Sequence, residues 1–435
     1  MKGGLGDLTN SNDSNHGNNQ QQPVERKQRK QTAEDLLDRF AIRTGLEKLD
    51  LQANNDTINH RSSSRRRRYL WTDAFALANY TNLNQDKEKR PSGEATIYQE
   101  YAMHLIDAVH ETLGKHRLDH KEPQKAGIWL PNASDEHPTS GGLRIGKPKD
   151  ERPPNLPCDI ETEWDKDGQY FHYLTKWATA LDMITRKCGN TKYTKWAMEL
   201  LQVASSKFVT HQYGRPQMYW KLSIELDRPQ VASQGARDAL EGYILATRLI
   251  GTCEECQIFF SPLLPSMFNL QRIFHSMIHV VESNDPLELG GMLLDMCQLC
   301  ALQKQMGSDD HRKTLLNDLQ KAVLSGLESI VQTKELEGPP DERTPFRELG
   351  LSLGLRAAER VLLDESNNSS PSFFTTPPLP KLQPFEEILV YLPVAEQIET
   401  YWMDPEHKST KSWRDHLDMN DIMLASTLNP SCWSQ

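Results

Sequence analysis

The chain has 435 residues, of which 37% are hydrophobic and 25% charged, with a formal net charge of −10. By length alone it could hold two or three domains, and it is long enough for a large core. The acidic balance argues against a general nucleic-acid-binding protein, which needs a basic surface to neutralise phosphates. No run of about 18 apolar residues is present, so we expect no membrane contact.

The N-terminal part differs in composition from the rest. Residues 1–68 are dominated by Asn, Gln, Ser and charged residues, which predicts a disordered, low-complexity tail. Within it, the apolar spacing predicts a short helix over residues 32–51. The first residues lack the apolar stretch of a secretory signal, so we expect a cytoplasmic protein. The basic run Arg65–Arg68 is either a nuclear-localisation signal or a solvated linker, which leaves a nuclear location open.

From Tyr69 to the C-terminus, apolar residues recur every three or four positions, which predicts one all-α domain over residues 69–435 with eleven or twelve helices. The clearest helical stretches cover residues 95–113, 170–185, 194–209, 236–250, 287–305, 315–331, 346–363 and 385–402. One segment, residues 218–224, is compatible with a strand. Two insertions interrupt this order: a Pro/Gly-rich loop over residues 114–167 and a Ser/Pro-rich segment over residues 364–382. A loop as long as the first is often functional.

The densest candidate site lies at the end of that loop, where four carboxylates fall within the seven residues Glu161–Asp167. We expect a helix to begin near Gly168. A carboxylate beside aromatic rings can act as a general acid or base once burial adjusts its pKa. We therefore assign catalytic roles to Glu163, Asp165 and His172, and substrate-binding roles to Trp164, Asp167 and Tyr170. Alternatively, Asp167 simply caps the following helix.

Four further segments supply candidates. The Gly-rich run from His137 to Lys147 offers His137, Arg144 and Lys147 for substrate binding, although Arg144 paired with the acidic segment is an equal reading. Asp73, near the start of the first core helix, is either a catalytic carboxylate or a helix cap. In the predicted strand, Tyr219, Trp220 and Lys221 are candidates for lining a cavity. Near the C-terminus, Asp415 adjoins His416, which is either an acid–base group or structural.

We expect no metal and no cofactor. The pairs Cys253/Cys256 and Cys297/Cys300 have C-x-x-C spacing, but about 40 residues separate them and the second lies in an apolar helical run, so buried free thiols are the better interpretation. No Walker loop, nucleophile elbow or dinucleotide-binding fingerprint is present.

The same segments resemble an uncharacterised family within the six-hairpin glycosidase-like superfamily. The matching stretches are residues 71–75, 137–147, 163–177, 218–223, 285–287, 346–350 and 402–426. The resemblance implies that about six helical hairpins close into an (α/α)6 toroid with long inserted loops, and it adds Glu348 as a substrate-binding candidate. The chain departs from the family where Asp238-Ala239-Leu240-Glu241-Gly242 stands for the expected Asp-Pro-Leu-Asp-Gly.

The superfamily contains glycoside hydrolases, glycan lyases and N-acylglucosamine 2-epimerase-like enzymes, so the resemblance implies a sugar-active enzyme. A hydrolase would use two of the cavity carboxylates, and an epimerase would use His172 or His137 to move a proton beside a carbonyl. The expected partner is a small molecule, either a carbohydrate or a hydrophobic metabolite. Two alternatives remain: an enzyme that holds or cyclises an isoprenoid- or polyketide-like substrate, and a non-catalytic ligand-binding protein. The oligomeric state is open.

Overall fold

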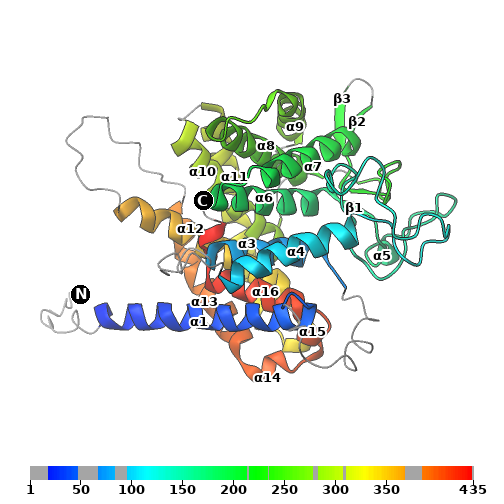
Figure 1. Cartoon of the computed structure of the whole chain (residues 1–435). Coiled ribbons are helices and arrows are strands. Elements are labelled where there is room, and N and C mark those ends of the chain that lie inside the picture. The colour runs from blue at the N-terminus through cyan, green and yellow to red at the C-terminus, as the bar shows by residue number, and fades with distance from the viewer. Residues whose placement is uncertain are drawn as a thin grey trace, which may run out of the picture.

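The computed structural model describes residues 18–47, 67–83, 96–212, 215–233, 235–277, 283–306, 310–367 and 385–433. The fold is all-α (Figure 1). Its longer helices are α1 (Asn18–Thr44), α3 (Leu70–Leu83), α4 (Ile97–Leu113), α6 (Phe171–Cys188), α7 (Lys192–Phe208), α8 (Ala236–Glu255), α9 (Leu264–Met277), α10 (Pro286–Met306), α11 (Asp310–Thr333), α12 (Pro345–Asn367), α13 (Leu392–Met403) and α16 (Leu417–Leu428). No helix in this part of the chain combines the length and apolar character needed to cross a bilayer.

Six of these helices form an inner ring. In chain order α3, α6, α8, α10, α12 and α16 each pack on the next, and α16 packs back on α3. Each inner helix also packs on an outer one: α3 on α4, α6 on α7, α8 on α9, α10 on α11, α12 on α13, and α16 on α1. The described helices therefore close into six hairpins, which is the predicted toroid.

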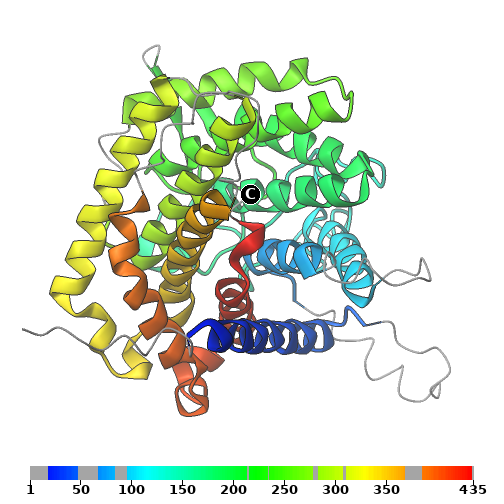
Figure 2. The ribbon, with the colours of Figure 1, turned by 90° about the vertical axis from the view of Figure 1, so that its left-hand side faces the viewer.

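The sixth hairpin joins the two ends of the chain, since α1 lies beside α16 (Figure 2). This corrects the sequence-based boundary at residue 69. The helix predicted over residues 32–51 ends at Thr44 and begins much earlier, at Asn18. Its apolar side chains Leu36, Leu37 and Phe40 are buried in the common core, so α1 is an outer helix of the ring. Residues 1–17 and 48–66 of the predicted tail, and residues 368–384 of the Ser/Pro-rich insertion, lie outside the described part.

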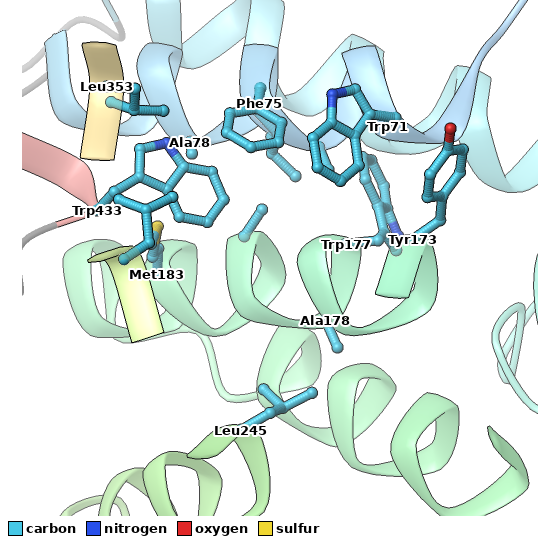
Figure 3. Packing of buried hydrophobic residues seen from close by; sticks show 14 of the residues in the cluster. Trp71, Phe75, Ala78, Tyr173, Trp177, Ala178, Met183, Leu245, Leu353 and Trp433 are labelled. Atoms are coloured by element: carbon cyan, nitrogen blue, oxygen red, sulfur yellow. The ribbon is translucent and has the colours of Figure 1, made fainter. Parts of the chain in front are cut away.

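The inner helices are buried on nearly all sides, because each contacts neighbours within the ring and an outer helix. Every residue of α3 is buried. Trp71 and Phe75 on α3 face Tyr173 and Trp177 on α6, and Trp433 packs against Phe75 with ring centroids 4.5 Å apart (Figure 3). Such close packing of large rings stabilises the ring of helices through buried apolar area.

Helices α10 and α12 approach each other particularly closely. A Cβ atom at Gly290 would lie 2.1 Å from the carbonyl oxygen of Gly350. Glycine is required there because any side chain would collide with the backbone of the facing helix.

Short elements complete the fold. They are α5 (Ile160–Glu163), α14 (Pro405–Lys408), α15 (Lys411–Arg414), the 3-10 turns η2 (Ser261–Leu263), η4 (Glu335–Glu337), η5 (Pro340–Glu342), η7 (Ile388–Tyr391) and η8 (Pro430–Cys432), and the strands β1 (Gln169–Tyr170), β2 (Val209–Gln212), β3 (Arg215–Met218) and β4 (Lys221–Leu222). Strand β1 pairs antiparallel with β4, and β2 with β3. The strand predicted over residues 218–224 is thus two short pieces, and α6 begins at Phe171, after β1, rather than near Gly168.

Candidate active site

The described residues enclose a cavity of about 1050 Å³ at one end of the ring. All six inner helices contribute to it with their N-terminal turns. The contributing residues are Trp71 and Thr72 of α3, His172 and Tyr173 of α6, Arg237 and Asp238 of α8, Leu287 and Glu288 of α10, Phe346 and Arg347 of α12, and Leu417 and Asp418 of α16. The cavity is therefore the place where the partial positive charges of six helix N-termini converge.

His172 and Asp238 form the most chemically versatile pair in the cavity. Nδ1 of His172 lies 3.3 Å from Oδ1 of Asp238, which joins the first turns of α6 and α8. The imidazole ring stacks on Tyr170, with ring centroids 5.4 Å apart and an interplanar angle of 19°. A carboxylate at Nδ1 favours the tautomer in which Nε2 carries no proton, so this arrangement leaves Nε2 of His172 able to accept one.

A second histidine, His416, also lines the cavity, and it directly precedes the first residue of α16. Partial burial and the positive charge of Lys147 both lower the pKa of His416. Lys147 itself lies 5.1 Å from the ring centroid of Tyr69, and its pKa is lowered by burial. At neutral pH His416 is therefore uncharged and can also accept a proton.

Two guanidinium–carboxylate pairs belong to the cavity lining. Arg237 Nε lies 2.6 Å from Glu288 Oε2, and Arg347 Nη1 lies 2.5 Å from Asp285 Oδ2. Each of these carboxylates is therefore already paired with a guanidinium group. The two pairs bring charge and hydrogen-bonding groups to the cavity.

Arg237 also belongs to a buried charge cluster. Arg237 also contacts Glu241 at 2.5 Å and Asp295 at 3.2 Å, and Lys176 contacts Glu241 at 3.2 Å. Burial raises the pKa of Asp295. Burial acts in the same direction on Glu241, but Arg237 and Lys176 outweigh it and hold the pKa of Glu241 below its usual range. The cluster fixes Arg237 at the cavity wall, since a guanidinium held by several carboxylates cannot easily move.

Aromatic rings cover much of the remaining wall. Trp164 stacks on Trp220, with centroids 5.1 Å apart and an interplanar angle of 27°, and Tyr170 lies 5.4 Å from Trp220. Trp164 is 49% exposed, so the pair presents a flat apolar face at the edge of the cavity.

Several residues proposed from the sequence line this cavity. They are Lys147, Trp164, Asp165, Tyr170, His172, Trp220 and Asp415. Asp165 is exposed, and the hydrogen bond from Lys149 Nζ, 2.9 Å away, lowers its pKa.

The other carboxylates of the acidic loop lie outside the cavity. Glu163 is buried and contacts Lys221 Nζ at 2.9 Å and Arg152 Nε at 3.2 Å. Asp167 is buried against Arg144 at 2.5 Å and accepts a hydrogen bond from the backbone N–H of Gly146 at 3.0 Å. The predicted cap is therefore wrong, since the N-cap of α6 is Tyr170. The alternative reading of Arg144, as a partner of the acidic segment, is confirmed.

The remaining candidates also lie away from the lining. Asp73 is buried and accepts a hydrogen bond from the backbone N–H of Tyr69 at 3.1 Å. Glu348 is buried between Arg343 and the Nε1–H of Trp402, and exposed His137 contacts Glu199 at 2.7 Å. Tyr219 packs on the core. Each of these side chains has a structural partner in place of a position on the cavity wall.

Several charged cavity residues were not selected from the sequence, among them Arg237, Asp238, Asp285, Glu288 and Arg347. A usable signal was available, because each of these five stands at or just before the start of a predicted helix. In a ring of hairpins, alternate helices point the same way, so their first turns meet at one end.

The structure identifies no metal centre within its described range: no group of three or more His, Cys, Asp or Glu side chains is arranged to hold an ion. Cys253, Cys297 and Cys300 are buried in the core, and Cys256 is partly buried.

No protein-family model matches the chain, and no curated protein matches it. Among solved structures, a sugar epimerase from a ruminal bacterium aligns with 82% of this chain and 86% of its own, at 11% identity and a TM-score of 0.44.

Proposed function

We propose that the chain is a sugar-active enzyme of the epimerase or isomerase type, which removes and returns a proton at a carbon next to a sugar carbonyl. The observation that supports this most directly is the pair of histidines in one cavity, with His172 positioned by Asp238 at 3.3 Å. Epimerisation needs one group to take a proton and another to supply one, and imidazole does both near neutral pH.

The surroundings of the histidines fit a carbohydrate. Sugars carry hydroxyl groups and apolar C–H faces, and the cavity combines charged side chains with the Trp164–Trp220 face. A pocket for an isoprenoid would be lined mainly by rings. Here the lining includes the cations Arg43, Arg67, Lys147, Arg237, Arg347 and Arg414, and an apolar ligand would cover these charged groups and remove them from water.

Glycoside hydrolysis fits the carboxylates less well. It requires a protonated carboxylic acid whose pKa is raised, opposite a second carboxylate. Asp165 has a lowered pKa because of Lys149, and Glu288 and Asp285 each contact a guanidinium group. The carboxylates Glu163 and Asp73, proposed from the sequence, do not line the cavity.

Proton exchange with solvent tests the proposal directly. The full chain is incubated in D2O with glucose, mannose, N-acetylglucosamine and N-acetylmannosamine, and deuterium at C2 is followed by proton NMR. We expect exchange on at least one sugar, reduced by about 10²–10⁴-fold in His172→Asn and in His416→Asn. The matched control is His211→Asn, because His211 is exposed on β2, away from the cavity lining.

Two results would contradict the proposal. One is the absence of C2 exchange on the whole panel. The other is exchange that persists within about threefold in both cavity variants, which is far less than loss of an acid–base group produces. Release of nitrophenol from nitrophenyl glycosides without C2 exchange would instead favour a hydrolase.

A further inference from the structure

We propose that Lys147 is a catalytic amine, which forms an imine with the aldehyde carbon of an open-chain sugar or of another hydroxyaldehyde. This deepens the proposed function, because an imine at C1 makes the neighbouring C2 proton easier to remove. The proposal rests on that function for the proton transfer, whereas imine formation can be measured by itself.

Lys147 is a partly buried lysine in the cavity lining. Its Nζ lies 5.1 Å from the ring centroid of Tyr69, and it forms no ion pair with any carboxylate in the described part of the chain. The fully buried Lys221 differs, because its Nζ lies 2.9 Å from the carboxylate of Glu163. A lysine that loses hydration without gaining a counterion is shifted toward its uncharged form, which is the nucleophile.

The carboxylates that act on Lys147 from the acidic loop are engaged elsewhere. Asp165 Oδ2 lies 2.9 Å from Lys149 Nζ, and Asp167 Oδ1 accepts three backbone hydrogen bonds. Burial, together with the charge of Lys221, outweighs both carboxylates and lowers the pKa of Lys147. A larger share of this amine is therefore neutral than in an exposed lysine, which is the usual way that a protein activates a lysine for reaction with a carbonyl.

The backbone at Lys147 is fixed on both sides. Its N–H donates to Asp167 Oδ1 at 3.3 Å, and its carbonyl oxygen accepts from Arg117 Nη1 at 2.8 Å. The preceding residue, Gly146, has a φ of +92°, and a Cβ atom there would lie 2.1 Å from the carbonyl oxygen of Arg68. Only glycine fits this conformation and this close approach. The lysine side chain therefore starts from a held position at the cavity, which lowers the entropic cost of reaction.

A base stands close to the amine. His416 also lines the cavity, and partial burial and the charge of Lys147 lower its pKa. An uncharged imidazole can take one proton from the ammonium group of Lys147, which releases the nitrogen lone pair for attack.

Imine formation then conserves charge and releases one water molecule. The neutral amine forms a C–N bond to the aldehyde carbon, and the aldehyde oxygen becomes a hydroxyl group with a proton from that nitrogen. The imidazolium of His416 gives its proton to the hydroxyl group, which leaves as water when the C=N bond forms. The product is a protonated imine on Lys147 beside an uncharged His416. The positive nitrogen withdraws electrons from C2, so His172 can remove the C2 proton, and water hydrolyses the imine after that proton has returned.

Reductive trapping tests for the imine directly. The full chain is incubated with D-glyceraldehyde and sodium cyanoborohydride, which reduces a protonated imine to a stable secondary amine. Peptide mass spectrometry of the wild-type chain then gives the rate of labelling at each lysine. The reference residues are Lys121 and Lys149, which are exposed and lie outside the cavity lining. We expect Lys147 to be labelled about tenfold faster than either of them, because the neutral amine is the reactive form.

A charge-preserving variant separates an imine from simple charge pairing with the ligand. Lys147→Arg keeps the positive charge but cannot form the imine, because a guanidinium group stays protonated. We expect it to show no adduct at this position and to lower C2 exchange on the sugar panel by about 10²-fold or more, as loss of other catalytic groups does. Lys149→Arg is the matched control and should exchange like wild type. Thermal melting checks that both variants are folded.

Two results overturn the proposal. One is labelling of wild-type Lys147 at a rate within about threefold of the reference lysines, which marks an ordinary amine. The other is wild-type C2 exchange in folded Lys147→Arg, which would assign Lys147 a role as a charge alone.

The outcomes for the two proposals are distinguishable. If Lys147 is trapped preferentially while the sugar panel shows no C2 exchange, the reactive amine stands and the proposed epimerisation fails. If C2 exchange occurs equally in wild type and Lys147→Arg, and no preferential adduct forms, the epimerisation stands and the amine proposal fails.

Discussion

The acidic loop Glu161–Asp167 and the mouth of the inner helices use charge in opposite ways. In the loop, Glu163 and Asp167 have their hydrogen-bonding capacity filled by Lys221, Arg152 and Arg144. At the helix mouth, His172 and Asp238 retain capacity that no described residue uses, as Oδ2 of Asp238 shows. A high density of carboxylates in the sequence therefore marked a folded loop, whereas the candidate site is built from first turns of helices that are far apart in the sequence.

The charged side chains of the loop form hydrogen bonds with backbone groups, because the loop has little regular secondary structure in which those backbone groups could pair with one another. Asp167 accepts from the backbone N–H groups of Gly146, Lys147 and Gly168. Arg144 contacts Asp167 and also donates to two backbone carbonyls, those of Lys115 and Thr112. These bonds hold the loop as one wall of the cavity, so its acidic residues support the site from outside.

The largest expected effect comes from removing the buried loop carboxylate. Glu163→Gln should lower the free energy of unfolding by about 3–5 kcal/mol, because it leaves Lys221 charged and buried without its counterion. The measurement is chemical denaturation followed by circular dichroism. The double variant Glu163→Gln/Lys221→Met is the control: it removes the stranded charge and should recover part of the loss. Wild-type stability in the single variant would show that the loop does not depend on this pair.

Asp73 offers a third case for the comparison. It is a buried carboxylate whose pKa is set more by burial than by neighbouring cations. Burial raises the pKa of Asp73 to about 6, against which Arg68 and the Tyr69 N–H act only partly. A raised pKa means that the folded state favours the protonated form. Its contribution to stability is complete below the unfolded pKa, near 4, and is lost as pH rises through about 6.

Wild type should therefore lose about 3 kcal/mol relative to Asp73→Asn between pH 4 and pH 7, at about 1.4 kcal/mol per pKa unit. Unfolding free energies of the two proteins across this range give the difference, in which other titrating groups cancel. A difference that stays constant with pH would mean that Asp73 is ionised in the folded state throughout, like the carboxylates of the loop.

Most of the fold could be predicted from the sequence. The 3.6-residue periodicity located eight helices, for example residues 95–113 against α4 (Ile97–Leu113). It could not assign α1 to the ring, because only the last third of that helix has apolar spacing. The buried positions Leu36, Leu37 and Phe40 are surrounded by polar residues along the chain, and their partners on α16 are almost 400 residues away.

The site was harder to predict for a related reason. Which carboxylates find a cation depends on contacts between distant segments: Glu163 and Lys221 are 58 residues apart, and so are Arg237 and Asp295. Local sequence cannot distinguish a carboxylate that is neutralised in this way from one that faces a cavity. Histidines at the first turns of alternate helices, such as His172, were the more informative pattern because ring topology brings those turns together.

The smallest expected effect belongs to Asp165, the one loop carboxylate that reaches the cavity. Its side chain is 60% exposed, and that of its partner Lys149 is 61% exposed. An ion pair in such contact with water contributes about 0–1 kcal/mol, because solvent screens the attraction and ordering two mobile side chains costs entropy. Asp165→Asn should therefore change the free energy of unfolding by less than about 1 kcal/mol in the same denaturation assay. Lys149→Met is the matched variant and should behave alike, with the small difference vanishing in 1 M salt. A loss comparable to that of Glu163→Gln would mean that the loop is held by its exposed charges as much as by its buried ones, and the contrast between buried and exposed carboxylates drawn above would fail.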